Sequence, residues 1–236
     1  MQRVNRYQPP HAAITHSQRP NNGRHGVTVV PRFCTRFRQH IGNKTGGGIN
    51  LDDYPAEKVI DAENNIVCPG FVDLHSHAGL NILGEPHHDP KVRQGVTTEL
   101  VGIDGISHAP LKTREGLERY IWLNAGLNWC PPKPDWLSTQ EHINKYDDKV
   151  AVNIAYILGN SHVRIRSFSW EDRPATKAQI ADMRAVIRES MEEGAWGLST
   201  RLDCPPGAFD STEELIAISE QTAEIRGFYY THTRSF

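Results

Sequence analysis

The sequence predicts an α/β fold built on a parallel sheet. From about Ile66 onward, short apolar runs alternate with amphipathic stretches, the pattern expected when strands are joined by crossover helices. One of these runs, residues 151–158, is almost continuously apolar, as a strand covered on both faces should be. Signals for the start and end of helices lie between the later runs. Together these observations argue against an exposed antiparallel sheet.

Five segments are candidate strands, and each is short and mostly apolar. In chain order they are residues 67–75, 97–103, 150–158, 195–200 and 228–232. The chain between successive candidates is long enough for the crossover that parallel neighbours require. We therefore expect five strands of one parallel sheet.

Two helices between the last three strands are marked at both ends. Thr176 and Gln179 have the spacing of a capping box, and Gly194 is the expected stop. Ser211 and Glu214 repeat the spacing, with Gly227 as the stop. Apolar residues at helical spacing are expected to be core: Ile180, Met183, Ile187 and Met191 in the first helix, and Leu215, Ile218, Thr222 and Ile225 in the second.

Length and composition fit one globular unit. The 236 residues are 38% hydrophobic and 23% charged, which excludes wholesale disorder, and a single (β/α)₈ barrel has roughly 200 to 250 residues. No apolar run approaches the ~20 residues that span a bilayer, and the first residues do not read as a secretory signal. Cys34, Cys68, Cys130 and Cys204 are too scattered for a Cys-x-x-Cys site. We expect a cytoplasmic protein that binds no membrane.

The first fifty residues differ in charge from the rest. Residues 1–51 contain eight Lys or Arg and no Asp or Glu, whereas the remainder holds eighteen basic and twenty-eight acidic residues. A basic arm for nucleic acid and a mitochondrial transit peptide are alternatives. However, basic runs are absent and residues 46–48 are three glycines, which break any helix. We expect residues 1–50 to be a basic, poorly ordered leader that binds no nucleic acid.

The most informative stretch is residues 69–77, Pro-Gly-Phe-Val-Asp-Leu-His-Ser-His. Because side chains alternate along a strand, His75 and His77 point the same way and could bind one cation. Imidazole nitrogens suit zinc, which takes nitrogen, sulfur or carboxylate donors at about 2.0 to 2.3 Å. A His-x-His pair alone is often a chance occurrence, so two polar residues at a strand end are the alternative.

Further motifs, in a consistent order, narrow the interpretation. They are residues 69–77, residues 95–107 followed by Ala109 and Pro110, residues 194–200 with Cys204 before residues 205–208, and residues 230–234. Over residues 55–236 the sequence resembles the N-acyl-D-amino-acid deacylase (D-aminoacylase) family of the amidohydrolase superfamily. The resemblance implies a partial TIM (β/α) barrel of the metal-dependent hydrolase type, with about five of its eight strands present.

The resemblance also implies a division into parts and a set of metal ligands. The parts are the leader 1–50, a remnant of a small β domain with lead-in 51–68, and the N-terminal part of the barrel 69–236. The implied ligands are His75, His77, Asp104 and His232. Asp104 stands where some members of the family have cysteine, and a carboxylate can also bridge two cations. Without a metal, Asp104 would cap the turn before Gly105, and His232 would be a core histidine.

The activity implied by the resemblance is zinc-dependent hydrolysis of a linear amide in a small molecule, an N-acyl-D-amino acid. Strands six to eight, with a further zinc histidine and the aspartate expected as general base, lie outside this sequence, so we assign no catalytic base and expect an incomplete enzyme. The alternative is a non-catalytic truncated fragment or metal-binding relic. An open piece of barrel is expected to self-associate through its exposed edges.

A cyclic-amide hydrolase of the hydantoinase or dihydroorotase type is less favoured. Those enzymes use a carbamylated lysine on strand four, and residues 178–236 contain no lysine. Other polar residues receive no ligand role. Glu99 falls in mid-strand and is expected to be buried and paired. The histidines without a partner at metal spacing are expected at the surface or in loops: His87, His88, His108 and His162.

Overall fold

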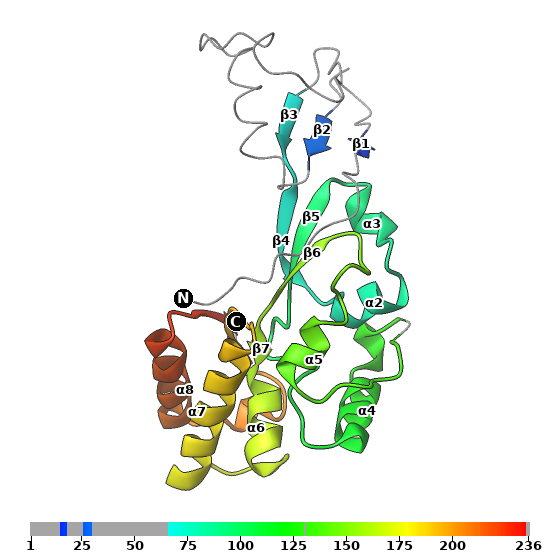
Figure 1. Cartoon of the computed structure of the whole chain (residues 1–236). Coiled ribbons are helices and arrows are strands. Elements are labelled where there is room, and N and C mark those ends of the chain that lie inside the picture. The colour runs from blue at the N-terminus through cyan, green and yellow to red at the C-terminus, as the bar shows by residue number, and fades with distance from the viewer. Residues whose placement is uncertain (1–14, 18–25, 30–65, 130, 235–236) are drawn as a thin grey trace, which may run out of the picture.

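The computed structural model describes residues 15–17, 26–29, 66–129 and 131–234. Its strands form three sheets of three strands, in the orders β1-β2-β3, β4-β5-β6 and β7-β8-β9. Their bounds are β1 Thr15–Ser17, β2 Gly26–Val29, β3 Ile66–Pro69, β4 Phe71–Ser76, β5 Val96–Val101, β6 Asn153–Tyr156, β7 Leu158–Gly159, β8 Gly197–Arg201 and β9 Phe228–His232. The small sheet β1–β3 lies at one end of the molecule, beyond β4–β6 (Figure 1).

The strands from β4 to β9 form a parallel succession. β4 pairs with β5, β5 with β6, β7 with β8, and β8 with β9, each time in parallel. Only Ile157 separates β6 from β7, and its N–H donates to Val101 O at 2.9 Å. Five strand positions therefore follow one another, with β6 and β7 sharing one position. The predicted α/β fold, a partial barrel with about five strands, is confirmed.

Two predicted strands have different bounds. The predicted strand 67–75 is divided at Gly70, because β3 joins β2 in the small sheet and β4 joins β5. A Cβ atom at Gly70 would lie 2.0 Å from Thr97 Oγ1, so the neighbouring strand passes too close for any side chain. The predicted strand 150–158 begins only at Asn153 and is interrupted at Ile157.

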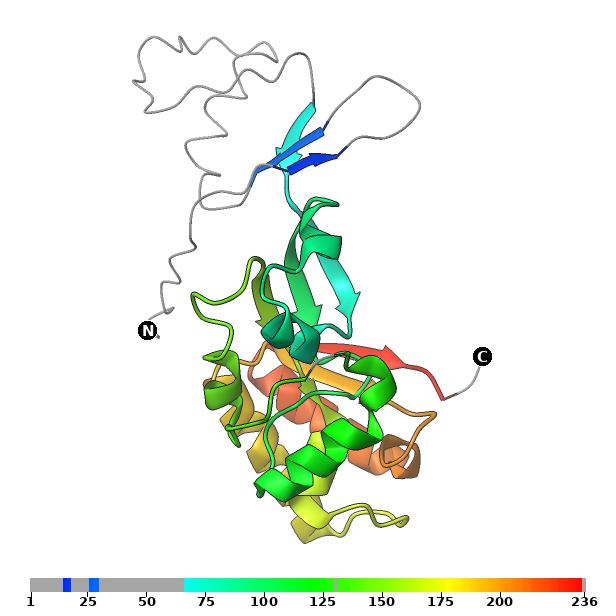
Figure 2. The same ribbon diagram turned by 90° about the vertical axis from the view of Figure 1, so that its right-hand side faces the viewer.

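Helices connect the successive strands from β4 to β9, except between β6 and β7. Their bounds are α2 Gly79–Gly84, α3 Asp89–Val92, α4 Arg114–Leu123, α5 Thr139–Ile143, α6 Asn160–Phe168, α7 Lys177–Glu192 and α8 Thr212–Glu224, with 3₁₀ turns η3 Ala125–Leu127 and η4 Gly207–Phe209. Helices α6, α7 and α8 lie side by side against the sheet β7–β9 (Figures 1 and 2).

Both predicted capping boxes form at the N-termini of α7 and α8. The Thr176 side chain accepts from Gln179 N, and the Gln179 side chain accepts from Thr176 N. Ser211 and Glu214 make the same reciprocal pair. Each box satisfies backbone donors that the first helical turn leaves without partners.

The two predicted glycine stops act differently. Gly194 has φ +114, which supports its role in ending α7. After α8 the left-handed residue is Arg226, with φ 60, rather than Gly227. A Cβ atom at Gly227 would lie 2.2 Å from Met191 Cε, so the end of the Met191 side chain would have to move to make room for it.

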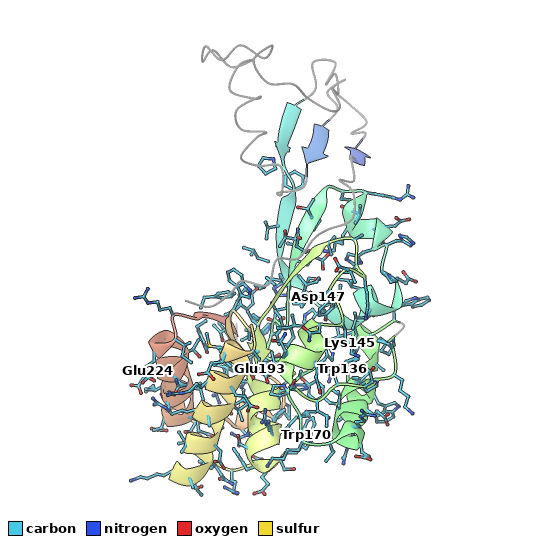
Figure 3. The ribbon with its side chains drawn as sticks, in the orientation of Figure 1. Trp136, Lys145, Asp147, Trp170, Glu193 and Glu224 are labelled. Atoms are coloured by element: carbon cyan, nitrogen blue, oxygen red, sulfur yellow. The ribbon has the colours of Figure 1, made fainter. Side chains whose placement is uncertain are left out.

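The predicted apolar stripes lie partly in the core, since four of their eight residues are buried and Ile180, Met191, Leu215 and Ile225 are half-buried. Met183, Ile187 and Ile218 are fully buried and pack with Leu158 and Leu198 of the sheet. The outer sides of the same helices carry ion pairs. One joins Arg184 of α7 to Glu224 of α8 at 2.9 Å. Glu224 is labelled on α8 in Figure 3.

Part of the predicted leader belongs to the small sheet. β1 and β2 fall within residues 1–50, and β2 pairs with β3. Most of residues 1–65 lie outside the described residues, so the division into parts stays a prediction. Cys68 and Cys204 are free thiols, whereas Cys34 and Cys130 lie outside the described residues. Among the described helices none combines the length and apolar character needed to cross a membrane.

Candidate metal centre

Three side chains with metal-binding atoms meet where β4 and β5 end. His75 lies on β4, His77 just after it, and Asp104 in the loop after β5. Asp104 Oδ2 lies 3.3 Å from His75 Nε2 and 3.3 Å from His77 Nε2. One ligand atom from each residue falls within 4.8 Å of the others. We call these three residues the candidate metal centre.

Strand pairing places the two histidines beside the aspartate loop. Ser76 of β4 is in register with Val101 of β5, so both strands end at the same level. The register shifts between Asp73 and Ser76, and Asp73 Oδ1 accepts from the His75 N–H at 2.9 Å. The two imidazole rings lie edge to face, with centroids 5.6 Å apart. The His-x-His spacing therefore gives the shared direction that the sequence predicts.

The Asp104 loop is held in an uncommon conformation. Asp104 has φ 52, a left-handed value that costs free energy for a residue with a side chain. Ser199 of β8, fully buried, clamps the loop from the neighbouring sheet. Gly105 N donates to Ser199 Oγ at 3.0 Å, and Ser199 Oγ donates to Gly102 O at 2.5 Å. Sequence reasoning missed Ser199, whose motif signals only a strand.

The buried carboxylate of Asp104 fits a cation. Asp104 is 6% exposed, and its Oδ1 atom is buried without a hydrogen-bond partner among the described residues. Burying a carboxylate without compensation is costly unless it binds a cation or a proton. Two imidazoles and one carboxylate are a donor set that divalent zinc accepts. The residues present therefore fit a divalent metal ion.

The charges around the candidate metal centre favour the protonation states that bind a cation. Burial lowers the pKa of His77 below its usual value, although the Asp104 carboxylate acts in the opposite direction. A neutral imidazole keeps the lone pair that a metal needs. Burial acts to raise the pKa of Asp73, but its interactions with Lys91 and with the N–H and charge of His75 together outweigh this, so the pKa of Asp73 is lowered. Negative charge therefore stands close to the two histidines.

The second ring nitrogen of His75 also has a partner. His75 Nδ1 lies 2.5 Å from the hydroxyl oxygen of Tyr230, on β9. Burial raises the pKa of Tyr230, and the carboxylates of Asp104 and Asp73 add to this. Sequence reasoning gave Tyr230 no role, because the contact joins positions 155 residues apart and no local pattern marks it.

His232 takes a different position from the other predicted ligands. It is paired in register with Arg201 across β8 and β9, and its Nδ1 lies 3.5 Å from Asp203 Oδ1. It is not one of the three residues whose ligand atoms cluster among the described residues. A role for His232 in metal binding therefore stays a prediction.

Glu99 is buried and paired as predicted. It is 0% exposed, with Ser76 Oγ donating to its Oε2 at 2.5 Å. His88 Nε2 lies 2.6 Å from Glu99 Oε1, and the His88 side chain is only 10% exposed. His88 lies in the loop before α3, as predicted, but its side chain is mostly buried, whereas His87 is exposed. Glu99 supplies the partner that takes His88 out of solvent.

His108 lies in a loop, as predicted, but is buried, and the prediction of a surface or loop position is wrong for His162, which is buried in α6. Together with His142 they form a buried histidine cluster among aromatic rings. Burial lowers the pKa of His108 to about 3, and lowers the pKa values of His142 and His162 well below the usual range. Aromatic packing outweighs the polarity of these rings, which spacing in the sequence does not reveal.

Comparisons with known proteins identify the family of this chain. Residues 58–234 match the model of the Amidohydrolase family. An N-acyl-D-aspartate deacylase from Alcaligenes xylosoxydans xylosoxydans is 34% identical over 221 residues, which cover 89% of this chain and 42% of that protein. A D-aminoacylase from the same organism is 35% identical over 186 residues, covering 78% of this chain and 37% of that protein.

Solved structures give the same result. A D-aminoacylase variant in complex with copper chloride is similar with a TM-score of 0.68 at 31% identity, covering 79% of this chain and 38% of that one. An N-acyl-D-glutamate deacylase from Bordetella bronchiseptica, complexed with zinc and a phosphonate inhibitor, gives a TM-score of 0.62 at 27% identity, covering 72% and 35%. The chain thus spans between 35% and 42% of the length of these relatives.

Proposed function

The chain belongs to the amidohydrolase family, and from this membership we propose that it supplies metal ligands of a zinc-dependent N-acyl-D-amino-acid deacylase. The observation that carries the proposal is the buried Asp104 carboxylate, which faces two imidazole nitrogens with one oxygen and leaves the other without a partner. The relatives named as deacylases of N-acyl-D-amino acids supply the substrate class.

The proposed reaction is hydrolysis of a linear amide in a small molecule. Water adds to the acyl carbon, the bond from that carbon to nitrogen breaks, and a proton passes to the leaving amine. Bound zinc would supply a water of lowered pKa, near ~7, and would polarise the acyl carbonyl. We assign no general base among the described residues.

The residues of this chain would bind and orient the metal. His75 and His77 would each present Nε2, and Asp104 would present its carboxylate. Zinc is proposed because two nitrogen donors and a carboxylate suit it, and because one solved relative is complexed with zinc. His232, on β9, is proposed as a further ligand on the strength of the family resemblance alone.

Zinc content and amide hydrolysis together test the proposal. Protein would be loaded with zinc, dialysed, analysed for metal, and assayed for amino acid released from N-acetyl-D-aspartate, N-acetyl-D-glutamate and N-acetyl-D-leucine. We expect the wild-type chain to retain zinc. Asp104→Ala and His77→Ala should lose the zinc together with any release of D-amino acid that the wild type shows, whereas His87→Ala, which changes an exposed histidine, should match the wild type in both.

Two results would contradict the proposal. One is wild-type protein that retains no zinc after dialysis. The other is release of amino acid that Asp104→Ala leaves unchanged, because the chemistry would then lie elsewhere. Equal rates on N-acetyl-L-aspartate would reject the D-amino-acid specificity alone.

We also propose that the chain pairs with a second copy of itself, and that it works in the cytoplasm. Among the described strands, β4 has one neighbour, β5, and exposes Phe71 and Leu74 at 56% and 62%. Unpaired edges with apolar side chains favour such pairing. Sedimentation should then show a dimer, and a monomer at all concentrations would reject this pairing.

The proposed location in the cytoplasm is supported by the free thiols of Cys68 and Cys204, which are in keeping with a reducing compartment.

A further inference from the structure

The hydroxyl group of Tyr230 lies against the candidate metal centre. Its oxygen is 2.5 Å from His75 Nδ1, while His75 Nε2 lies 3.3 Å from Asp104 Oδ2. The two rings are tilted at 59° with centroids 5.8 Å apart. We propose that Tyr230 is a positioning residue, which holds His75 in the tautomer and orientation that present Nε2 to the cation. This inference rests on the proposed metal-binding function.

The chemistry of neutral imidazole explains the role. One ring nitrogen carries the proton and the other carries the lone pair that binds a metal. If His75 Nε2 binds the cation, Nδ1 carries the ring proton. The Nδ1–H group then donates a hydrogen bond to the phenol oxygen of Tyr230. A partner on the second nitrogen fixes both the tautomer and the ring orientation of a metal-binding histidine.

His75 needs such a partner more than the other two residues. Its side chain is 53% exposed, compared with 29% for His77 and 8% for Asp104. Packing therefore restrains the Asp104 carboxylate but leaves the His75 ring free to rotate. Ordering that ring before the metal arrives removes an entropic cost of binding.

Tyr230 is itself well anchored. Its ring packs on a cluster of Leu100, Ile103 and Ile157, which are at least 96% buried. Ile103 is the residue immediately before Asp104, so the same cluster supports the aspartate loop. Tyr230 therefore links β9 to the ends of both strands that carry the candidate ligands.

The adjacent tyrosine offers a matched control. Tyr229 also lies on β9, but its hydroxyl is 2.7 Å from Thr200 Oγ1 and makes no contact with the candidate metal centre. Tyr229→Phe and Tyr230→Phe each remove one hydroxyl group from one strand. Only the second removes the partner of His75.

Two measurements test the role of Tyr230. Long-range proton–nitrogen NMR of the metal-free protein reports which His75 nitrogen carries the proton. Competition with a chromophoric chelator gives the dissociation constant for zinc. We expect wild type and Tyr229→Phe to hold the proton on Nδ1 and to bind zinc within about twofold of each other. Tyr230→Phe should show mixed tautomers and bind zinc about tenfold more weakly.

The outcomes separate this inference from the proposed function. An unchanged His75 tautomer in Tyr230→Phe overturns the positioning role, as does an equal effect of the two variants on zinc affinity. A tautomer change in Tyr230→Phe, found in a protein that binds no zinc, supports the positioning role and rejects the proposed function. Loss of folding in either variant would appear in the spectra, and Tyr230→Trp, which offers no oxygen acceptor, would then replace Tyr230→Phe in the same two measurements.

Discussion

Two groups of histidines in this molecule differ in burial and in partners. His75 and His77 lie at the open ends of parallel strands and share the carboxylate of Asp104. His108, His142 and His162 are at most 6% exposed, and no described carboxylate forms an ion pair with them. The same side chain is therefore a candidate ligand in one region and core in the other. The difference teaches that access and a nearby negative charge, not residue type, make a metal centre.

His142 illustrates the core role. The hydroxyl of Tyr146 donates to Gly79 O, so His142 Nε2–H must donate to the Tyr146 oxygen at 3.0 Å. The other nitrogen, Nδ1, keeps a lone pair and has no partner among the described residues. His142 lines a small pocket of about 10 Å³, which has room for about one water molecule.

The largest expected effect is a loss of stability in acid, because burial disfavours the protonated form of these three histidines in the folded state. Burial holds the pKa of His108 near about 3 against a usual 6.5, and lowers the pKa values of His142 and His162 as well. Burial also raises the pKa of Asp210 to about 7 despite its ion pair with Arg164. Between pH 6 and 4 these three histidines therefore bind fewer protons in the folded chain than in the unfolded chain, and stability should fall as the pH is lowered.

Urea denaturation between pH 7.5 and 4.5 checks this slope. The sign follows because a histidine with a lowered pKa stabilises the folded state fully above pH 6.5 and loses that contribution as the pH falls. The carboxyl of Asp210 acts in the opposite sense, since its contribution is lost as the pH rises toward 7. His162→Phe should make this pH dependence shallower, because it removes one of the groups with a lowered pKa. A flat profile in wild type would show that the buried histidines do take protons.

Replacing one histidine in each region tests whether the two groups contribute differently to the free energy of unfolding. His142→Ala leaves a cavity beside Trp136, whose ring centroid is 4.9 Å away, and removes the bond to Tyr146. We expect a loss of about 3 kcal/mol in the free energy of unfolding. His75→Ala, at a half-exposed side chain, should change it by less than about 0.5 kcal/mol. Urea titrations with a chelator present measure both, and equal losses would contradict the distinction.

A smaller loss of stability is expected when Ser199 of β8, which holds the loop of Asp104, is changed. Ser199→Ala removes both bonds that clamp the Asp104 loop, which should cost about 1 to 2 kcal/mol and weaken zinc binding. Ser190→Ala removes a buried bond to Thr139 away from the candidate metal centre. It should cost stability but leave zinc affinity unchanged. If both variants bind zinc like wild type, the clamp does not position Asp104.

Local rules made part of this structure predictable. The capping boxes at Thr176 and Ser211 depend on positions three residues apart, and both form. The shared direction of His75 and His77 follows from strand alternation, and the apolar stripes of α7 and α8 follow from helical spacing. In each case the interacting groups are neighbours along one element. The parallel five-strand order was predictable for the same reason, from the alternation of such elements.

The sequence alone was enough to predict the five-strand parallel order, the two capped helices α7 and α8, and the pair of histidines at the end of β4. Only the tertiary structure decided which strand approaches closely enough to require Gly70, and which histidines aromatic rings enclose. It also decided that Ser199 clamps the loop of Asp104 and that Tyr230 meets His75. The contacts of Ser199 with Gly105 and of Tyr230 with His75 join residues 94 and 155 positions apart, so their geometry depends on how whole sheets and helices pack rather than on any local pattern.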